Sequence, residues 1–331
     1  ARGAGMSLAG VLVVAIGRNE GERLRRCLAS LGGPAGLVVY VDSGSTDGSR
    51  ELAASMGAEV VALDMTVPFT AARARNAGFQ RGRELAPAAA CVQFIDGDCE
   101  MRAQWLETAS AFMAAHAEVA AVCGRRRERH PERSVYNLLC DLEWTVPPGP
   151  ARACGGDAMF RTAALAEVGG YNPGMIAGEE PELCVRLRQR GWGVQVLAVE
   201  MTLHDANMLR FGQWWVRSVR AGYAYAEGAA LHGGLPERHN VRELLRCVGW
   251  GLVVPLLTLL GMALWGPAAA WLLALYPAQA MRLFIHGKGT SRTRFLRATF
   301  LGIGKFAEVT GALRYWRMRL LKRQATLIEY K

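Results

Sequence analysis

Three carboxylates gather at the point where a strand-length apolar run ends. The segment VQFIDGDCEM, residues 92–101, places Asp96, Asp98 and Glu100 within five positions. Side chains two positions apart share a face of an extended segment, and Mg²⁺ binds through one or two carboxylates together with substrate phosphates. Asp96 and Asp98 are therefore candidates for holding a cation against a diphosphate. Because Asp and Gly are also turn residues, a solvated turn is the alternative, and Glu100 receives no role.

Two further polar loops follow apolar runs earlier in the chain. GRNEGE (residues 17–22) follows VLVVAI, and DSGSTDGS (42–49) follows LVVYV. Such runs alternate with segments of helical spacing, which predicts an α/β fold with a parallel sheet and crossover helices. Ligands of these sheets bind at the carboxyl ends of the strands, so we expect the three loops to converge on a crevice suited to a nucleotide, a sugar or a metal. The runs predicted as strands are residues 11–16, 37–41, 59–63, 91–95 and 119–123.

The composition narrows the class of protein. With 331 residues, 51% of them hydrophobic and 21% charged, the chain is globular, and its length favours two units. Met6 is preceded by ARGAG, which we interpret as a cloning remnant (residues 1–5) outside the fold, and no secretory signal is expected. The eight cysteines include no C-x-x-C pair, so we expect reduced core residues of a cytosolic domain.

Six segments, in chain order, resemble the family 2 glycosyltransferases, which are inverting nucleotide-sugar enzymes of the GT-A fold. The segments are AIGRNEGERLRRCLASL, VVYVDSGSTDGS, FTAARARNAGF, FIDGDCEM, GGDAMFRTAALAEVGGYNPGM and GEEPELCVRLRQRGW. They cover roughly residues 11–222. The resemblance implies a Rossmann-like, mostly parallel GT-A catalytic domain, which we place at residues 6–231. An α-helical, membrane-associated C-terminal region is expected at 232–331.

The resemblance also implies a site for a nucleotide-diphosphate sugar. In the family the Asp of the D-x-G-S-T-D loop contacts the nucleobase, and here that residue is Asp42, with Glu20 beside it. Arg75 is implied to lie near the base and the phosphates. Asp98 is expected on Mg²⁺ or Mn²⁺, with Asp96 at both the metal and the donor. The alternatives are a helix cap for Asp42 and a solvated helix face for Arg75. The other residues assigned to the donor by their matched motifs are Asn19, Gly156 and Asp157.

The catalytic base is expected at the start of a later helix. Inverting transfer is a single displacement, so a carboxylate must take the proton of the acceptor hydroxyl as that oxygen attacks the anomeric carbon. The family usually has Glu-Asp at this site, and here the pair is Glu179-Glu180. Glu180 occupies the Asp position and is the expected base. Because Glu180 has one methylene more than the Asp usual at this position, its carboxylate reaches a different place, and Glu179 is kept as the alternative base. Glu182 is interpreted as a helix-face or capping residue.

Three other features bear on the mechanism. His204 follows the strand-like run VQVLAVEM and is a candidate for the metal or the diphosphate, with a structural histidine as the alternative. Processive relatives carry Q-x-x-R-W, whereas this chain has QWWVRS, with Arg217 one place late, which favours one sugar per encounter. The arginine-rich segment GRRRERHPERS (residues 124–134) is read as a solvated loop or a phosphate contact and is not assigned to the site.

The C-terminal third predicts attachment to a membrane. Residues 247–281 form an uncharged stretch of 35 residues, and from His286 to Lys331 eleven Lys or Arg stand against two Glu. A spanning helix needs about 20 apolar residues, and positive charge on both flanks favours two cytoplasmic ends. We therefore expect an apolar hairpin or re-entrant pair at about 247–281 and a basic amphipathic helix at about 292–323 lying in the interface. A buried hairpin of a soluble domain or an oligomer interface is the alternative.

Together these features predict metal-assisted, non-processive sugar transfer to a lipid-linked or envelope glycan acceptor. We place the catalytic domain on the cytoplasmic face of a membrane, most simply the bacterial inner membrane. Membrane lipids are expected partners, nucleic acid is not, and a homo-oligomer stays open. One alternative is a nucleotidyltransferase, although GRNEGE is not the Gly-rich basic loop that such enzymes carry. The other is a membrane scaffold that has lost catalysis, suggested by the Glu-Glu departure.

Overall fold

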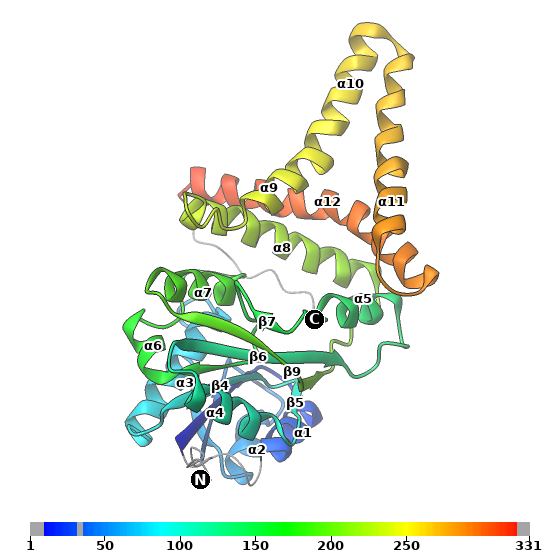
Figure 1. The fold of residues 1–331 in the computed structure, drawn as a ribbon. Coiled ribbons are helices and arrows are strands. Elements are labelled where there is room, and N and C mark those ends of the chain that lie inside the picture. The colour runs from blue at the N-terminus through cyan, green and yellow to red at the C-terminus, as the bar shows by residue number, and fades with distance from the viewer. Residues whose placement is uncertain (1–9, 32–35, 323–331) are drawn as a thin grey trace. The chain divides into compact units, whose positions relative to one another are not determined.

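The computed structural model describes residues 10–31 and 36–322 (Figure 1). The expected cloning remnant, residues 1–5, and the last predicted residue of the amphipathic helix, 323, lie outside the described residues. The chain divides into two compact units. Unit 1 comprises Ala1–Pro131 and Cys140–Asn207, and unit 2 comprises Glu132–Leu139 and Met208–Lys331.

Unit 1 is built on a mixed sheet of nine strands within the described residues. Their order is β3, β2, β1, β4, β8, β6, β9, β5, and β7 pairs with β9. The β3-β2-β1-β4 half is parallel, as is the β6-β9 pair, whereas β8 runs antiparallel between β4 and β6. The strands are β1 (Val11–Gly17), β2 (Leu37–Asp42), β3 (Glu59–Ala62), β4 (Cys91–Asp96), β5 (Cys99–Met101), β6 (Val119–Glu128), β7 (Gly149–Pro150), β8 (Ala158–Arg161) and β9 (Gly193–His204).

Helices cover this sheet, as expected for crossover connections. The five runs predicted as strands are all observed, whereas the short strands β5, β7 and β8 were not predicted. The mostly parallel α/β class is confirmed. The helices are α1 (Glu22–Leu31), α2 (Ser49–Ser55), α3 (Ala71–Leu85), α4 (Trp105–Ala115), α6 (Thr162–Glu167) and α7 (Glu179–Gln189), with α5 (Val135–Glu143) passing from one unit to the other.

The central strands are buried on both faces, which explains their near-continuous apolar sequences. Every residue of β1 from Val11 to Ile16 is buried. Helix α3 packs closely on β1 and β2, and this close approach needs a glycine at position 78. A Cβ added to Gly78 would overlap the side chain of Val14. All eight cysteines are buried free thiols, as predicted for core residues.

The strand register brings the three polar loops together. Gly17, the last residue of β1, is paired with Asp42 at the end of β2, and Ile16 is paired with Asp96 at the end of β4. The loops that follow these strands therefore leave the sheet at one edge. The predicted convergence of the three loops is confirmed.

Unit 2 is helical in its described part. Two long helices, α8 and α12, pack against each other at glycines. A Cβ added to Gly222 would overlap the backbone of Glu308, and a Cβ added to Gly311 would overlap the carbonyl oxygen of Val219. Such close approach needs residues without side chains. The elements are α8 (Phe211–His232), α9 (Val241–Val248), the π-helix η2 (Gly249–Val253), α10 (Val254–Trp265), the 3₁₀-helix η3 (Pro267–Ala274), α11 (Leu275–His286) and α12 (Ser291–Leu320).

Two helical stretches of unit 2 are long and apolar enough to cross a membrane. They are Val241–Trp265 (25 residues) and Pro267–His286 (20 residues), and 17% and 0% of their apolar windows are buried. They meet at Gly266, whose φ of 85° makes the turn where the sequence places Trp265-Gly266-Pro267. Together they extend beyond the uncharged residues 247–281 at both ends, so the helical hairpin also includes charged residues that flank the predicted stretch, such as Arg242 and Arg282. Length and composition alone are weak evidence for a membrane.

Helix α12 covers most of the predicted amphipathic helix, but some of its apolar side chains are buried and others are exposed. Small residues, including Ala307 and Gly311, form its buried face against α8. The apolar residues at helical spacing that were expected to form the interfacial face are Phe295, Phe300, Ile303, Phe306, Val309, Leu313, Trp316 and Leu320. Val309 is instead buried, whereas Phe295, Leu313 and Leu320 are 61%, 50% and 80% exposed. The predicted interfacial face is therefore wrong at Val309, while these three side chains do lie on the surface.

Candidate active site

Arg75 lies at the centre of a buried charge cluster in unit 1. Thr70 caps α3 by accepting a hydrogen bond from the backbone N–H of Arg73 at 3.1 Å, and Arg75 follows in the first turns, 2% exposed. Its Nη1 lies 3.0 Å from Glu179 Oε1 and 2.9 Å from Glu180 Oε1. Its Nη2 lies 3.0 Å from Asp96 Oδ1. The alternative of a solvated helix face for Arg75 is therefore wrong.

The charge of Arg75 is fixed by these neighbours. Burial alone would lower the pKa of Arg75, but the carboxylates of Glu180 and Asp96 outweigh it and hold that pKa well above its usual range. A Cβ on Gly156 would lie 2.6 Å from Arg75 Nη2, 3.1 Å from Glu180 Oε1 and 3.2 Å from Asp96 Oδ2. The missing side chain at Gly156 thus lets the three charged groups meet.

Glu179 and Glu180 begin helix α7. The preceding residue, Gly178, has a φ of 78°, a conformation that favours glycine. Burial, followed by repulsion from Glu179, raises the pKa of Glu180 to about 7, with Arg75 opposing the rise. A carboxylate with such a pKa accepts and releases protons near neutral pH. The Glu180 side chain is 14% exposed and that of Glu179 only 4%, so Glu180 is the more accessible of the two.

Glu182 has a different environment on the same helix. It forms a salt bridge with Arg186, one turn later, at 2.7 Å. It is thus engaged along its own helix rather than with Arg75, in keeping with the helix-face interpretation.

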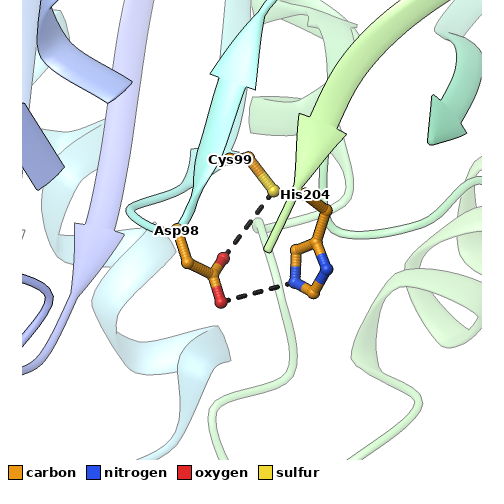
Figure 2. Close-up of side chains that lie close together, drawn as sticks. All are labelled: Asp98, Cys99 and His204. Atoms are coloured by element: carbon orange, nitrogen blue, oxygen red, sulfur yellow. Dashed lines mark hydrogen bonds and ion pairs between the residues drawn. The ribbon is translucent and has the colours of Figure 1, made fainter. Parts of the chain in front are cut away.

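Asp96 and Asp98 do not share one extended face. Strand β4 ends at Asp96, and the chain turns at Gly97 and Asp98, where Gly97 N donates to Ile16 O at 2.8 Å. Asp96 faces Arg75, whereas Asp98 lies beside His204 (Figure 2). The expected single face was wrong because a turn, not a strand, follows Asp96.

Asp98, Cys99 and His204 form a candidate metal group (Figure 2). Asp98 Oδ2 lies 3.3 Å from His204 Nε2, and Cys99 Sγ donates to Asp98 Oδ1 at 3.7 Å. One ligand atom from each residue lies within 4.8 Å of the others. A second group of the same kind consists of Asp96, Cys99 and Asp157.

The ligand chemistry of this first group fits a divalent cation. Asp98 offers a carboxylate oxygen and His204 an imidazole nitrogen, a mixed set that suits Mn²⁺ better than Mg²⁺, which prefers oxygen alone. His204 Nδ1 is buried without a hydrogen-bond partner among the described residues, and Glu128 Oε2 lies 3.8 Å from it. A carboxylate near the other ring nitrogen is the usual way to orient a ligating histidine.

The first two loops are tied together at the ends of β1 and β2. Asn19, with a φ of 55°, accepts from Thr46 N at 2.8 Å through its side chain and donates from its backbone to Ser45 Oγ at 2.9 Å. Asp42 Oδ2 accepts from Gly44 N at 3.0 Å and from Ser45 N at 2.9 Å. The loop thus places Asn19 and Asp42 together.

Two details of these loops differ from, or extend, the sequence interpretation. The helix-cap alternative for Asp42 is wrong, because α2 begins after Gly48. Glu20, beside this loop, pairs with Arg23 at 2.7 Å.

Asp157 holds the last residue of β4 through a hydrogen bond to its backbone. It is fully buried, accepts from Asp96 N at 3.0 Å through Oδ1 and accepts from Thr202 Oγ1 at 2.7 Å through Oδ2. Arg126 Nη2 lies 2.9 Å from the same Oδ2. A carboxylate so enclosed positions Asp96.

Comparison with known proteins identifies the family of this arrangement. The sequence profile described as glycosyl transferase family 2 matches residues 12–163. Glycosyltransferase AglE of Haloferax volcanii is 30% identical over 248 residues, which cover 71% of this chain and 77% of that protein. The chain belongs to glycosyltransferase family 2. The resemblance seen in the six motifs is thereby confirmed.

Another relative matches this family 2 glycosyltransferase over a similar length of the chain. The pre-mycofactocin glycosyltransferase of Mycobacterium tuberculosis is 28% identical over 239 residues, and the match spans 67% of this chain but only 48% of that protein. This chain thus covers about half the length of that relative.

Two solved structures share the fold of the family 2 chain. A mannosyltransferase from Pyrobaculum calidifontis, in complex with GDP-Man and Mn²⁺, has a TM-score of 0.64 at 18% identity and covers 92% of this chain and 86% of its own. S. aureus TarS 1–349 has a TM-score of 0.50 at 15% identity and covers 92% and 91%. The expected GT-A class is confirmed.

The sequence analysis did not assign Arg126 to the site, but in the structure of this family 2 glycosyltransferase Arg126 lies beside Asp96. Its Nη2 lies 3.5 Å from Asp96 Oδ2, and its guanidinium carbon lies 5.5 Å from the centre of the Trp144 ring. The alternation of side chains along a strand could have indicated that Arg126 and Arg127 have different surroundings. Strand β6 continues from Cys123 to Glu128, so Arg126 and Arg127 point to opposite faces, and Arg127 pairs instead with Asp141 and Glu200.

Proposed function

We propose that this chain transfers a sugar, with inversion, from a nucleotide-diphosphate sugar to an acceptor hydroxyl, and that Glu180 is the general base. The observation that carries the proposal is the contact of Arg75 with Glu180 and Asp96 around Gly156. It brings a carboxylate that titrates near neutral pH next to the end of β4, where the D-x-D segment begins. Membership of glycosyltransferase family 2 supports the reaction class and leaves the nucleotidyltransferase alternative without support.

Glu180 would take the proton of the acceptor hydroxyl. As that oxygen bonds to the anomeric carbon, the bond from this carbon to the diphosphate breaks on the opposite face of the sugar, which inverts the anomeric configuration. Because the pKa of Glu180 is about 7, a large share of this carboxylate is ionised at neutral pH and ready to accept a proton. Arg75 holds the carboxylate in place, and Glu179, on the same guanidinium nitrogen, is the alternative base.

The donor would lie over the converging loops. Asn19, Glu20 and Asp42 sit at the ends of β1 and β2, where a nucleoside would be held, and Asp157 keeps Asp96 in position. Mn²⁺ or Mg²⁺ held by Asp98 and His204, with Asp96 nearby, would supply positive charge to the departing diphosphate.

We further propose that the acceptor is a lipid-linked or envelope glycan and that unit 2 attaches the protein to a membrane. The support is the pair of apolar helical stretches, whose side chains are largely exposed: Leu256, Leu260 and Leu264 are 53%, 53% and 62% exposed. Attachment would occur with the catalytic unit on the cytoplasmic side. The departure from Q-x-x-R-W supports transfer of one sugar per encounter. An interface between copies of the chain is the competing explanation for the exposed leucines.

A direct assay tests this function. The full chain in neutral detergent is incubated with Mn²⁺ or Mg²⁺ and a panel of nucleotide sugars, beginning with GDP-mannose, and release of the nucleoside diphosphate is measured. We expect metal-dependent turnover, a product of inverted anomeric configuration by NMR, and retained donor binding without turnover for Glu180→Gln. Failure to bind or hydrolyse any donor would reject the enzyme. Donor binding by the wild type without transfer to any acceptor would favour the catalytically inactive scaffold.

Membrane attachment is tested separately by flotation with phosphatidylcholine vesicles. Attachment predicts that the full chain floats with the vesicles. A chain that stays in the aqueous fraction as a defined oligomer would instead place the exposed leucines in an interface between copies.

A further inference from the structure

A cavity of about 570 Å³ lies in unit 2 at the beginning of the apolar hairpin. This volume is within the range of sites for small ligands, roughly 300 to 1,000 Å³. Both charged and apolar side chains surround it. Its lining consists of Arg238, Val241, Arg242, Leu245, Arg246, Gly249 and Trp250.

The three arginines of the cavity are spaced for a common ligand. Arg238, Arg242 and Arg246 follow one another at intervals of four residues and all three are exposed. Arg242 and Arg246 lie one turn apart on α9, where like charges repel each other, and Arg238, whose φ is 46°, lies before the helix and lines the same cavity. Within residues 10–31 and 36–322, no salt bridge is found for any of them. An anion in the cavity would remove this repulsion.

The remaining lining is apolar and leads toward the hairpin. Leu245 is 63% exposed, and Val241 and Trp250 lie beside it in the cavity. The chain continues through η2, whose last residue, Val253, is 42% exposed, into α10, where Leu257 is 52% exposed. A ligand suited to this surface has an anionic head and a hydrocarbon chain. A nucleotide or a free sugar would leave the apolar part uncovered.

We propose that the cavity, which we call the arginine pocket, binds a phosphate group carried on an apolar chain, as in the headgroup of an anionic lipid. The guanidinium groups of Arg238, Arg242 and Arg246 would hold the phosphate oxygens, because arginine matches phosphate with paired hydrogen bonds. The hydrocarbon chain would lie on Leu245 and on the exposed side chains of α10. The proposal rests on the membrane attachment proposed above and adds a specific lipid site to it.

Calorimetry on the full chain in neutral detergent tests the pocket. The probes are dihexanoyl phosphatidic acid, dihexanoyl phosphatidylcholine and inorganic phosphate. We expect phosphatidic acid to bind at least tenfold more tightly than either other probe. Equal binding of inorganic phosphate would show a phosphate site without lipid specificity, and equal binding of phosphatidylcholine would show an apolar surface without a charge requirement. Either result overturns the proposal.

A matched pair of variants locates the binding. Arg238→Gln, Arg242→Gln and Arg246→Gln together should weaken phosphatidic acid binding at least tenfold. The control combines Lys288→Gln, Arg292→Gln and Arg297→Gln, which removes the same charge from three exposed positions of unit 2 and should leave binding unchanged. Equal losses in both variants would show diffuse attraction and refute a pocket. Unchanged circular dichroism and melting temperature are required of both.

Vesicle flotation separates this proposal from membrane attachment itself. If the full chain floats with phosphatidylcholine vesicles and phosphatidic acid adds nothing, attachment stands and the arginine pocket is rejected. If the chain floats with neither, the attachment fails and the pocket fails with it. Stronger flotation with phosphatidic acid, lost only in the arginine-pocket variant, supports both.

Discussion

Replacing Glu179 by Gln should move the acid limb of the pH–rate profile to lower pH. Glu180 must be ionised to act as base, so with its pKa at about 7 the rate falls as the pH drops through this value. The negative charge of Glu179 opposes that ionisation. Without it, Glu180 loses its proton more easily, and the enzyme keeps its activity at more acidic pH. Greater attraction from Arg75, which then has one partner fewer, acts in the same direction.

The size of the shift follows from the shared contact with Arg75. The two glutamate oxygens lie 3.0 and 2.9 Å from the same Nη1. They are therefore no more than about 6 Å apart, where two unit charges repel by about 0.7 kcal/mol at the permittivity of water and about 2.8 kcal/mol at an effective value of about 20. Because one pKa unit corresponds to about 1.4 kcal/mol, the limb should move down by roughly 0.5 to 2 pH units.

The assay is kcat/KM for donor turnover, measured across the pH range in which the protein stays folded. Glu167→Gln is the matched control, because this carboxylate contacts Arg190 at 3.7 Å and Trp192 at 2.9 Å and is not part of the Arg75 cluster. Its acid limb should coincide with that of the wild type. A limb in Glu179→Gln that stays in place, or moves to higher pH, would refute the assignment of the limb to Glu180.

Three further substitutions test the site and the packing. Asp98→Asn should weaken Mn²⁺ binding in the presence of a nucleoside diphosphate at least tenfold by calorimetry, whereas Glu100→Gln, whose carboxylate pairs with Arg26 at 3.2 Å, should not; equal effects would remove Asp98 as a ligand. Trp105→Phe removes the donor that bonds buried Gln93 Oε1 at 2.7 Å and should cost about 1–3 kcal/mol in urea unfolding, and a second change, Gln93→Leu, should recover part of it. Gly311→Ala should lower stability by about 1–3 kcal/mol because of overlap with α8, while Gly302→Ala on the same helix meets no atom and should not; equal melting temperatures in detergent would contradict the close packing.

Much of the fold and part of the site could be predicted because their signals are local. Strand-length apolar runs identified β1, β2 and β4, and the topology of parallel sheets then placed Asp42 and Asp96 at one edge. Strand β8 was missed because its four residues, AMFR, contain no β-branched side chain and lead directly into α6. The turn after Asp96 was kept only as the alternative, because a D-G-D sequence suits a turn as well as a strand end and the sequence does not show that pairing with β1 stops at Ile16 and Asp96.

Other features of the site depend on residues far apart in the chain. Arg75 and Glu179 are separated by 104 positions, and no local pattern reports their contact. Arg126 was left in a charged loop because the predicted strand stopped at Cys123, three residues before it. Extending that strand to Glu128 would have placed Arg126 and Arg127 on opposite faces of the sheet, although it would not have shown which of them meets Asp157.

The single guanidinium of Arg75 also couples the motions of the site. It joins α3, the end of β4 and the first turn of α7, which are remote in sequence, through contacts of 2.9 to 3.0 Å. The first turn of α7 therefore cannot fray without breaking these contacts, and segments that open together exchange their amide hydrogens with similar free energies. The start of α7 and the end of β4 should behave as one cooperative unit in hydrogen exchange, so that the base and the D-x-D segment are ordered or disordered together.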